Sequence, residues 1–243
     1  MSLEQSAIES APCAPCAPQR RGVPAQVPAY LEETYRWAYL NPRNLKLLDR
    51  PLIVSAILWG NYRRLLRMAL AELRPGQRVL QPACVYGDFS PVLAEFLGPE
   101  GRLEVTDVAP LQIENCRRKL SGLRQANARV RDAADLGGGG YDAVCCFFLL
   151  HELPEGYKRK VVDALLDSIR PGGKVIFVDY HRPHRAHPLK PVMSLVFDLL
   201  EPFAKGLWDF EIRSYTTQAA RFDWSKRTCF GGLYQISVAR RRA

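Results

Sequence analysis

The chain lacks any apolar run long enough to cross a bilayer as a helix. Its longest apolar stretch covers residues 52–59, whereas a membrane-spanning helix needs roughly 20 residues. No internal repeat and no cleavable signal segment is visible, and the seven cysteines are scattered without the pattern of a disulfide framework. These absences argue against a membrane-spanning or disulfide-stabilised protein and favour a reducing, cytoplasmic environment.

A second cysteine pair is also missing. Cys13 and Cys16 form one Cys-x-x-Cys motif, but a zinc site needs four ligands and no pair of matching spacing follows. The motif lies in residues 1–29, which are rich in Ala, Pro, Gln and Ser and show no hydrophobic period. We expect this segment to be a disordered tail and the cysteine pair to be inert.

Acidic residues are fewer than basic ones, and the formal net charge is +9. Such a surface attracts anions, whether a cofactor, a nucleic acid or an acidic lipid. Aromatic residues interleaved with basic ones on an exposed sheet are not evident, which disfavours nucleic acid as the partner. The 243 residues suffice for one α/β domain with a short extension.

Residues 30–74 are expected to form an N-terminal extension of two or three helices. The second would cover residues 52–73, apolar up to Trp59 and then amphipathic, with Arg63, Arg64 and Arg67 among leucines. A basic helix of this kind fits either a membrane surface or a lid over an active site. Both alternatives stay open from the residues alone.

Strand and helix patterns alternate through residues 75–243. Strands are expected at 78–82, 102–106, 128–131, 141–148 and 174–179, with a helix capped by Ser90 and another at 110–120. Residues 220–230 and 233–240 read as a hairpin around two glycines. The pattern predicts a doubly wound, Rossmann-like α/β fold of seven strands with an antiparallel last strand.

Polar residues follow the expected strands at the edge where such sheets bind ligands. Asp107 stands where a carboxylate accepts hydrogen bonds from both ribose hydroxyls of a nucleoside. Asp132 and Ala133 occupy the corresponding position beside an adenine. His151 follows the fourth strand and fits either a general base or a helix cap.

Seven short motifs together resemble the class I S-adenosylmethionine-dependent methyltransferases, nearest the quinone methyltransferases, over residues 75–240. They are Val79-Leu80, Gly87, Asp107, Asp132-Ala133, residues 141–144, residues 150–154 and residues 170–173. The loop at 84–90 and the segment at 39–44 resemble more narrowly the RquA-type rhodoquinone biosynthesis proteins.

One loop departs from the methyltransferase pattern, which reads as an acid followed by Gly-x-Gly-x-Gly. Gln81 replaces the acid, Ala83 and Val85 replace two glycines, and Gly87 remains. Glycine permits positive φ and close backbone approach, so these replacements must change the turn or the ligand against it. We expect Val85 and Tyr86 to displace the amino acid end of the cofactor, so that its α-amine faces the acceptor.

The narrower resemblance implies amino transfer to ubiquinone, in which an amino group replaces a ring methoxy group and gives rhodoquinone. S-adenosyl-L-methionine would be the nitrogen donor, held by Val85, Gly87, Asp107, Asp132 and Ala133, and Mn²⁺ the metal. A quinone methyltransferase with the same cofactor and a binding-only pseudo-methyltransferase are the alternatives.

The resemblance also suggests roles for polar side chains. Tyr86, Asp88 and His151 are the candidate catalytic residues, Tyr86 and His151 for proton transfer. Asp179 and His181 are the candidate metal ligands, with Asp88 and His184 as further candidates. Three of the four histidines lie within residues 181–187, and a histidine-rich loop facing solvent is the competing interpretation.

A quinone tail stays in the membrane, because each buried CH₂ is worth roughly 0.8 kcal/mol. The resemblance therefore implies a peripheral protein on the inner face of the cytoplasmic membrane, with ubiquinone and an anionic lipid surface as partners. The expected membrane-facing segments are residues 30–40, 52–73 and 189–203, with weak lipid attraction from residues 240–242.

Overall fold

A computed structural model describes residues 28–36 and 41–242 of the chain. Of the tail expected over residues 1–29, residues 1–27, including Cys13 and Cys16, lie outside these residues. Within them, the helices are too short or too polar to cross a membrane.

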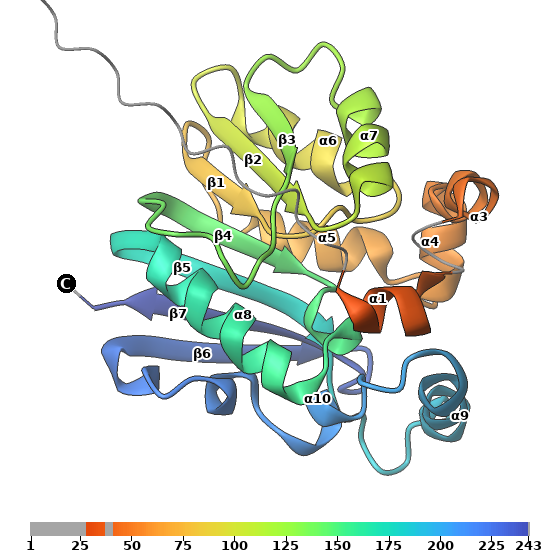
Figure 1. Ribbon diagram of the computed structural model, residues 1–243. Helices are drawn as coiled ribbons and strands as arrows, with labels where there is room; N and C mark the ends of the chain where they lie inside the picture. Colours follow the sequence, from red (N-terminus) through yellow and green to blue (C-terminus); the bar gives the residue numbers. More distant parts are fainter. Residues whose placement is uncertain (1–27, 37–40, 243) are drawn as a thin grey trace, which may run out of the picture.

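The core of the protein is one seven-stranded sheet in the order β3-β2-β1-β4-β5-β7-β6 (Figure 1). Its strands are β1 (Arg78–Gln81), β2 (Arg102–Asp107), β3 (Ala126–Val130), β4 (Tyr141–Phe147), β5 (Ile169–Tyr180), β6 (Phe222–Cys229) and β7 (Tyr234–Arg241). β1 to β5 pair in parallel, and β7 runs antiparallel to both β5 and β6. The predicted doubly wound fold and its terminal hairpin are confirmed.

Helices cover both faces of the sheet. One face packs on α5 (Tyr62–Leu70), α6 (Phe89–Leu97) and α7 (Pro110–Lys119), and the other packs on α8 (Glu155–Ser168). Successive strand residues point to opposite faces, so Val79 belongs to the first layer and Leu80 to the second. Both are fully buried, which explains why the central strands read as continuous apolar runs.

The remaining helices gather mainly at the carboxyl ends of the parallel strands (Figure 1). They are α1 (Ala29–Thr34), α3 (Pro42–Leu48), α4 (Pro51–Ile57) and α9 (Lys190–Leu200), with α10 (Gly206–Asp209) beside α8. Three short 3₁₀ turns, η1 (Leu150–Glu152), η2 (Ile212–Tyr215) and η3 (Ala219–Arg221), complete the described part of the chain. This arrangement builds a cover over the edge where the sheet binds ligands.

Two local predictions are wrong. The single helix expected over residues 52–73 is broken between α4 and α5, because Trp59 and Gly60 adopt left-handed φ values of 51° and 76°. The Asn61 side chain stabilises the break by donating to the carbonyls of Leu58 and Trp59. Ser90 is not a helix cap: α6 begins at Phe89, one residue earlier, and Asp88 precedes it.

Candidate active site

A cavity of about 360 Å³ lies at the carboxyl ends of the strands. Its walls are mainly apolar, and they come from the ends of β1 to β5 and from α1, α3, α4, α8 and α9. Of the predicted site residues, those that line it are Val85, Tyr86, Asp107, Asp132, Ala133 and His151. The other five, Gly87, Asp88, Asp179, His181 and His184, do not line it.

Asp107 ends β2 and projects its carboxylate at the cavity wall. Oδ2 accepts a hydrogen bond from the backbone N–H of Cys84 at 2.9 Å, and Oδ1 accepts one from Ala109 at 2.8 Å. Burial raises the pKa of Asp107 to about 6, against the opposing effect of these hydrogen bonds. Asp107 is therefore a buried acceptor that lines the cavity.

Asp132 lies at the end of β3 beside two tyrosines. Its Oδ1 accepts from the backbone N–H of Ala134 at 2.8 Å, and the Tyr157 hydroxyl donates to Oδ2. The ring of Tyr30, on α1, lies 5.4 Å from that of Tyr157. Two carboxylates and two aromatic rings at one end of the cavity fit the nucleoside of S-adenosylmethionine.

The altered loop is held from outside the cavity by a buried ion pair. The Lys119 ammonium lies 2.7 Å from the Asp49 carboxylate and also donates to the carbonyls of Val85 and Gly87. Asp49 in turn accepts from the Gly87 N–H at 2.8 Å and from the Asn115 amide at 2.7 Å. α3 and α7 therefore set the conformation of the loop that follows β1.

Gly87 and Asp88 pack against the N-terminal helices. Gly87 has φ of 82°, and a side chain there would place Cβ 3.3 Å from the Tyr62 hydroxyl and 3.4 Å from Val54. The Asp88 carboxylate accepts from the Tyr62 hydroxyl and from the Arg63 guanidinium, each at 2.8 Å. In this structure both residues join the loop to α4 and α5, and neither faces a ligand in the cavity.

Gln81, behind the cavity wall, and Tyr86, on it, set the polar groups around the altered loop. Gln81 is fully buried and donates from Nε2 to the carbonyl of Ala83 at 2.7 Å, so a neutral amide stands in place of the usual acid. Tyr86 lines the cavity, and its hydroxyl accepts from the Gln112 amide at 3.2 Å. Burial raises the pKa of Tyr86, so its phenol stays protonated and acts as a proton donor near neutral pH.

His151 lines the cavity after β4, three strands along the sheet from β3, which precedes Asp132. Its Nδ1 donates to Oδ1 of Asp179 at 2.9 Å, and the ring packs edge-on against Tyr180. Burial opposes charging of the imidazole, but the Asp179, Glu201 and Glu152 carboxylates outweigh it and raise the pKa of His151 to about 9. His151 is therefore an imidazolium at neutral pH. In this state it can donate a proton, and it can accept one only after it has lost its own.

The residues predicted to bind Mn²⁺ do not fit a metal site. Asp179 accepts hydrogen bonds from the N–H groups of Leu150, His151 and Tyr180 in addition to the imidazole. His181 pairs Nδ1 with the Gly232 carbonyl at 2.9 Å and Nε2 with Lys226. Among residues 28–36 and 41–242, the side chains of His, Cys, Asp and Glu form no cluster of three or more that could hold a metal ion.

Several site residues escaped the sequence interpretation. Tyr30 was assigned only to a possible membrane-facing segment, and Tyr157 to no role. Glu201, at the end of α9, lines the cavity and hydrogen-bonds with Tyr35, while burial raises its pKa. None of these residues belongs to a short motif. The one sequence signal is the aromatic-rich segment near residue 30, which indicates Tyr30 but neither Tyr157 nor Glu201.

Comparisons with known proteins agree with this geometry. The methyltransferase domain family matches residues 79–173. The ubiquinone/menaquinone biosynthesis C-methyltransferase UbiE of Haemophilus ducreyi is 29% identical over 119 residues, which cover 46% of this chain and 44% of that protein. The ubiquinone biosynthesis O-methyltransferase of Erwinia tasmaniensis is 32% identical over 113 residues, 44% of each chain.

A solved structure extends the likeness beyond the matched segment. The N-methyltransferase NodS of Bradyrhizobium japonicum, in complex with S-adenosyl-L-homocysteine, superimposes with a TM-score of 0.57 at 17% identity. The superposition covers 88% of this chain and 99% of NodS, and it shows the shared fold.

This chain spans about half the length of the curated relatives that it matches first. These relatives carry methyltransferase names, so the narrower resemblance to RquA-type proteins stays a prediction. The sheet order, the carboxylates that end β2 and β3, and the matched residues agree with one another. Residues 79–173 are therefore similar to the methyltransferase domain family, and the whole sheet shares the fold of a solved methyltransferase.

Proposed function

We propose that this protein uses S-adenosylmethionine to modify the ring of a quinone. One observation carries the proposal: a single, mainly apolar cavity is lined both by the Asp107 and Asp132 carboxylates and by the His151 imidazolium. Relatives named for ubiquinone biosynthesis support the quinone as acceptor. The apolar walls suit a ring that carries an isoprenoid tail.

We further propose that the transferred group is nitrogen, so that ubiquinone becomes rhodoquinone. When bound, the cofactor supplies either an electrophilic methyl group or a nucleophilic α-amine. The amine titrates near 7.7 to 8.0 in water, so only about a tenth is free base at pH 7. The mainly apolar walls favour the uncharged amine, because burial lowers an amine pKa, and behind them Gln81 places a neutral amide where the methyltransferase pattern has an acid.

His151 suits the acceptor half of this reaction. Addition of an amine to the ring carbon that bears methoxy forms a C–N bond and places negative charge on a quinone oxygen. The imidazolium can donate a proton to that oxygen, and Tyr86 is a second protonated donor in the same cavity. Loss of methanol then breaks the ring C–O bond and leaves the nitrogen bonded to both the ring and the α-carbon of the donor. Release of the aminated ring requires that N–Cα bond to break as well: water converts the α-carbon to a 2-oxo acid, and the quinone ring takes up the two electrons and leaves as the amino-hydroquinone.

Isotope labelling of the cofactor tests the proposal. Purified protein receives S-adenosylmethionine with ¹⁵N at the α-amine and ¹³C at the methyl group, with ubiquinone in one series and a demethylated ubiquinone in another. Each series is run with and without manganese. A product that has gained ¹⁵N and lost one methoxy group supports amino transfer.

The other outcomes decide between the alternatives. A product that carries ¹³C instead identifies a quinone methyltransferase and overturns the nitrogen proposal. Cofactor binding by calorimetry without any labelled product in either series identifies a binding-only protein. Turnover that strictly requires manganese would reveal a metal site formed only with the ligands in place.

A further inference from the structure

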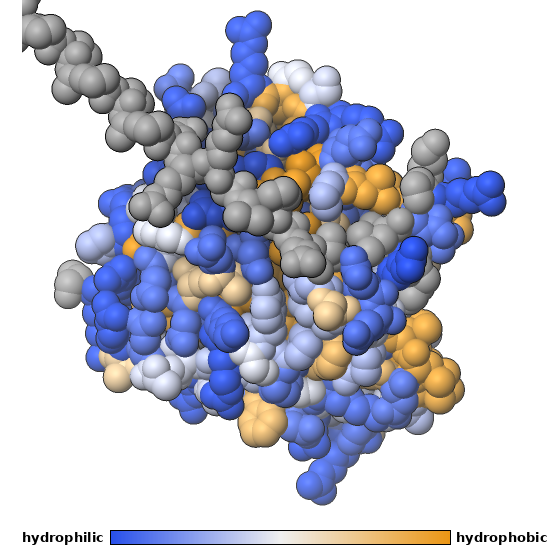
Figure 2. All heavy atoms as spheres, in the orientation of Figure 1, coloured by the Kyte–Doolittle hydropathy of each residue, from blue (hydrophilic) through white to orange (hydrophobic). Residues whose placement is uncertain are grey.

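Most of the exposed large apolar side chains gather on one face. The described residues hold ten such side chains, and eight of them lie on α3, α4, α9 and the turn after α4. We call this set the apolar face; it comprises Leu47, Leu52, Ile57, Trp59, Val192, Leu195, Leu199 and Leu200. Figure 2 shows hydrophobic surface at the lower right, where Figure 1 places α9.

The helix α9 is apolar on both sides. Met193 and Phe197 are buried against the body, whereas Leu195 and Leu199 are 59% and 70% exposed. Residues four apart lie on one side of a helix, so each pair forms its own stripe. The inner stripe, Met193 and Phe197, packs α9 onto the protein. The outer stripe, Leu195 and Leu199, makes no such contribution to folding.

The helix α4 continues the same surface. Leu52 is 85% exposed, whereas Val54 packs inside. The indole N–H of Trp59, just after α4, lies 3.3 Å from the sulfur of Met193 on α9. This contact joins the two helices, so their exposed side chains form one face.

The apolar face surrounds a way into the cavity. Ile57 is 50% exposed and Leu200 is 47% exposed, yet both also line the cavity. Val196, one turn before Leu200, lines it as well. An apolar molecule that meets this face can therefore contact the cavity lining directly through Ile57, Val196 and Leu200.

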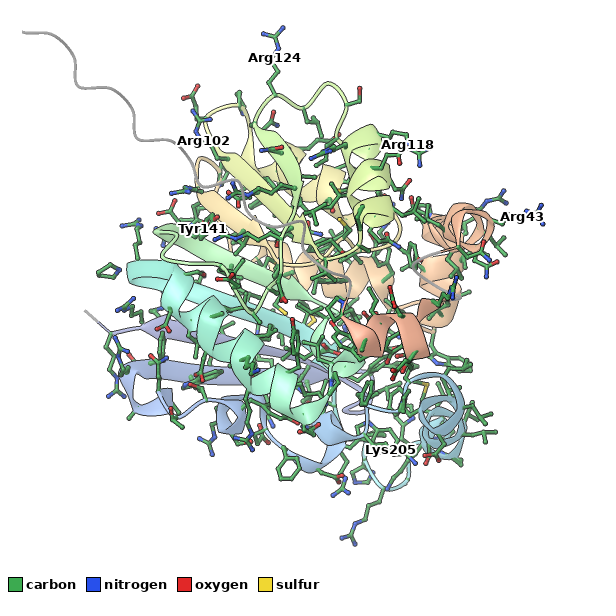
Figure 3. The ribbon with its side chains drawn as sticks, in the orientation of Figure 1. Arg43, Arg102, Arg118, Arg124, Tyr141 and Lys205 are labelled. Carbon is green, nitrogen blue, oxygen red and sulfur yellow. The ribbon has the colours of Figure 1, made fainter. Side chains whose placement is uncertain are left out.

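Basic residues border the face at the starts of its helices. Arg43 opens α3, Arg50 precedes α4, and Arg185 and Lys190 stand at the entry to α9. Arg43, Arg50 and Arg185 are exposed, and Figure 3 shows Arg43 projecting outward from α3. The exposed Asp198 of α9 is paired with Lys205. An apolar centre with a basic border is complementary to an anionic lipid bilayer.

We propose that the apolar face docks on an anionic lipid bilayer and opens the cavity toward the lipid. Leu52, Leu195 and Leu199 enter the headgroup and acyl boundary, while Arg43 and Arg50 contact anionic headgroups. The proposal rests on the proposed function in one respect, because a quinone acceptor gives the docked cavity its substrate. Docking itself requires only the face.

Vesicle flotation with the full chain tests the docking. Vesicles of phosphatidylcholine with phosphatidylglycerol should bind the protein, and vesicles of phosphatidylcholine alone should bind it at least tenfold more weakly. The variants Leu195→Glu/Leu199→Glu and Leu52→Glu should each lose at least tenfold in partition. Arg43→Gln should lose about fivefold, in proportion to the loss of one basic residue near an anionic surface.

Two exposed apolar residues elsewhere supply matched controls. Phe210→Glu and Val130→Glu make the same chemical change outside the face and should bind vesicles like the wild type. Circular dichroism and thermal unfolding confirm that each variant is folded. Leu52 is largely exposed, so its replacement keeps the test valid even if a change in α9 disturbs packing.

Defined results would overturn the proposal. The first is that the wild-type protein does not bind anionic vesicles, and the second is that the variants of the apolar face bind them as the wild type does. The third is that light scattering shows a dimer that binds no vesicles and that only the variants of the apolar face abolish. Turnover of a water-soluble short-tailed quinone separates the two proposals. Vesicle binding without turnover leaves docking intact and contradicts the quinone function.

Discussion

His151 and Asp179 form a buried ion pair, with 2.9 Å between Nδ1 and Oδ1, at the end of β5. Asp179 does not line the cavity, whereas His151 does. The carboxylate predicted as a metal ligand thus holds the imidazole in place and keeps it charged. Asp179 is a positioning residue in this structure, and its influence reaches a substrate only through His151.

Asp179→Asn should lower the pKa of His151 from about 9. Removing the nearest carboxylate leaves burial as the dominant influence, and burial disfavours the imidazolium. Histidine-selective NMR titration checks this shift, with the signals of the other three histidines as internal controls. If the His151 signal titrates unchanged in the variant, the ion pair does not set its charge.

The same pair should make stability depend on pH. The folded pKa of His151, about 9, exceeds the ordinary value of 6.5, so the contribution is fully present below pH 6.5 and is lost as pH rises through 9. The difference in unfolding free energy between wild type and Asp179→Asn should shrink across this range by on the order of 1 to 3 kcal/mol. Chemical denaturation at pH 6 and pH 9.5 measures it, and a difference that grows with pH would contradict the assignment.

Asp107→Asn should weaken binding of S-adenosyl-L-homocysteine by about tenfold, roughly 1.4 kcal/mol, through weaker hydrogen bonds to the ribose. Wild-type affinity should also fall as pH drops through about 6, because protonation removes the acceptor carboxylate. Calorimetry at pH 5 and pH 7.5 checks both effects. Asp135→Asn, an exposed acid outside the cavity lining, is the control and should bind normally.

The ion pair between Asp49 and Lys119 should contribute more to the free energy of unfolding than a surface ion pair does. Both side chains are largely buried, so removing one partner strands a charge, and Lys119→Met or Asp49→Asn should each cost about 2 to 4 kcal/mol. The double variant should cost less than the sum of the two single variants. Denaturation of all three proteins measures the coupling.

The exposed Arg242 and Asp223 pair is the control for this cycle. Its side chains are 60% and 65% exposed, and Asp223→Asn should cost about 0.5 kcal/mol or less. Equal losses at the buried and exposed pairs would mean that the loop is not held by Lys119.

Val85→Gly should change the outcome of the reaction more than cofactor affinity. Val85 lines the cavity and its carbonyl is held by Lys119, so the substitution removes side-chain bulk while the backbone contact stays. We expect cofactor affinity within about threefold of wild type, roughly 0.7 kcal/mol, and at least tenfold less amino transfer. Experiments with the doubly labelled cofactor measure both its affinity and the amount of amino transfer. Val92→Gly, on α6 outside the cavity lining, is not a matched control, because the glycine would lie within a helix. Val85→Ala therefore serves as the graded control.

Local patterns in the sequence were sufficient to predict the sheet. The apolar run of β4 and the two-glycine turn between β6 and β7 are short-range signals, because strand burial and turn geometry depend on neighbouring residues. Asp107 and Asp132 are predictable for the same reason: Asp107 ends β2, and Asp132 lies two residues beyond the end of β3. Parallel strands bring their carboxyl ends to one edge, so both acids had to meet there.

Only the tertiary structure decided which side chains those acids and the altered loop would meet. Asp49, Tyr30 and Glu201 lie far along the chain from the loop and from His151, and no local pattern predicts contacts between distant segments. The sequence by itself determined the strands, the turn residues and the cofactor edge, since each depends on residues close together in the chain. The charge on His151, the Lys119 clamp on the loop and the apolar face beside the cavity depend on burial, and burial is decided only when the whole chain has folded.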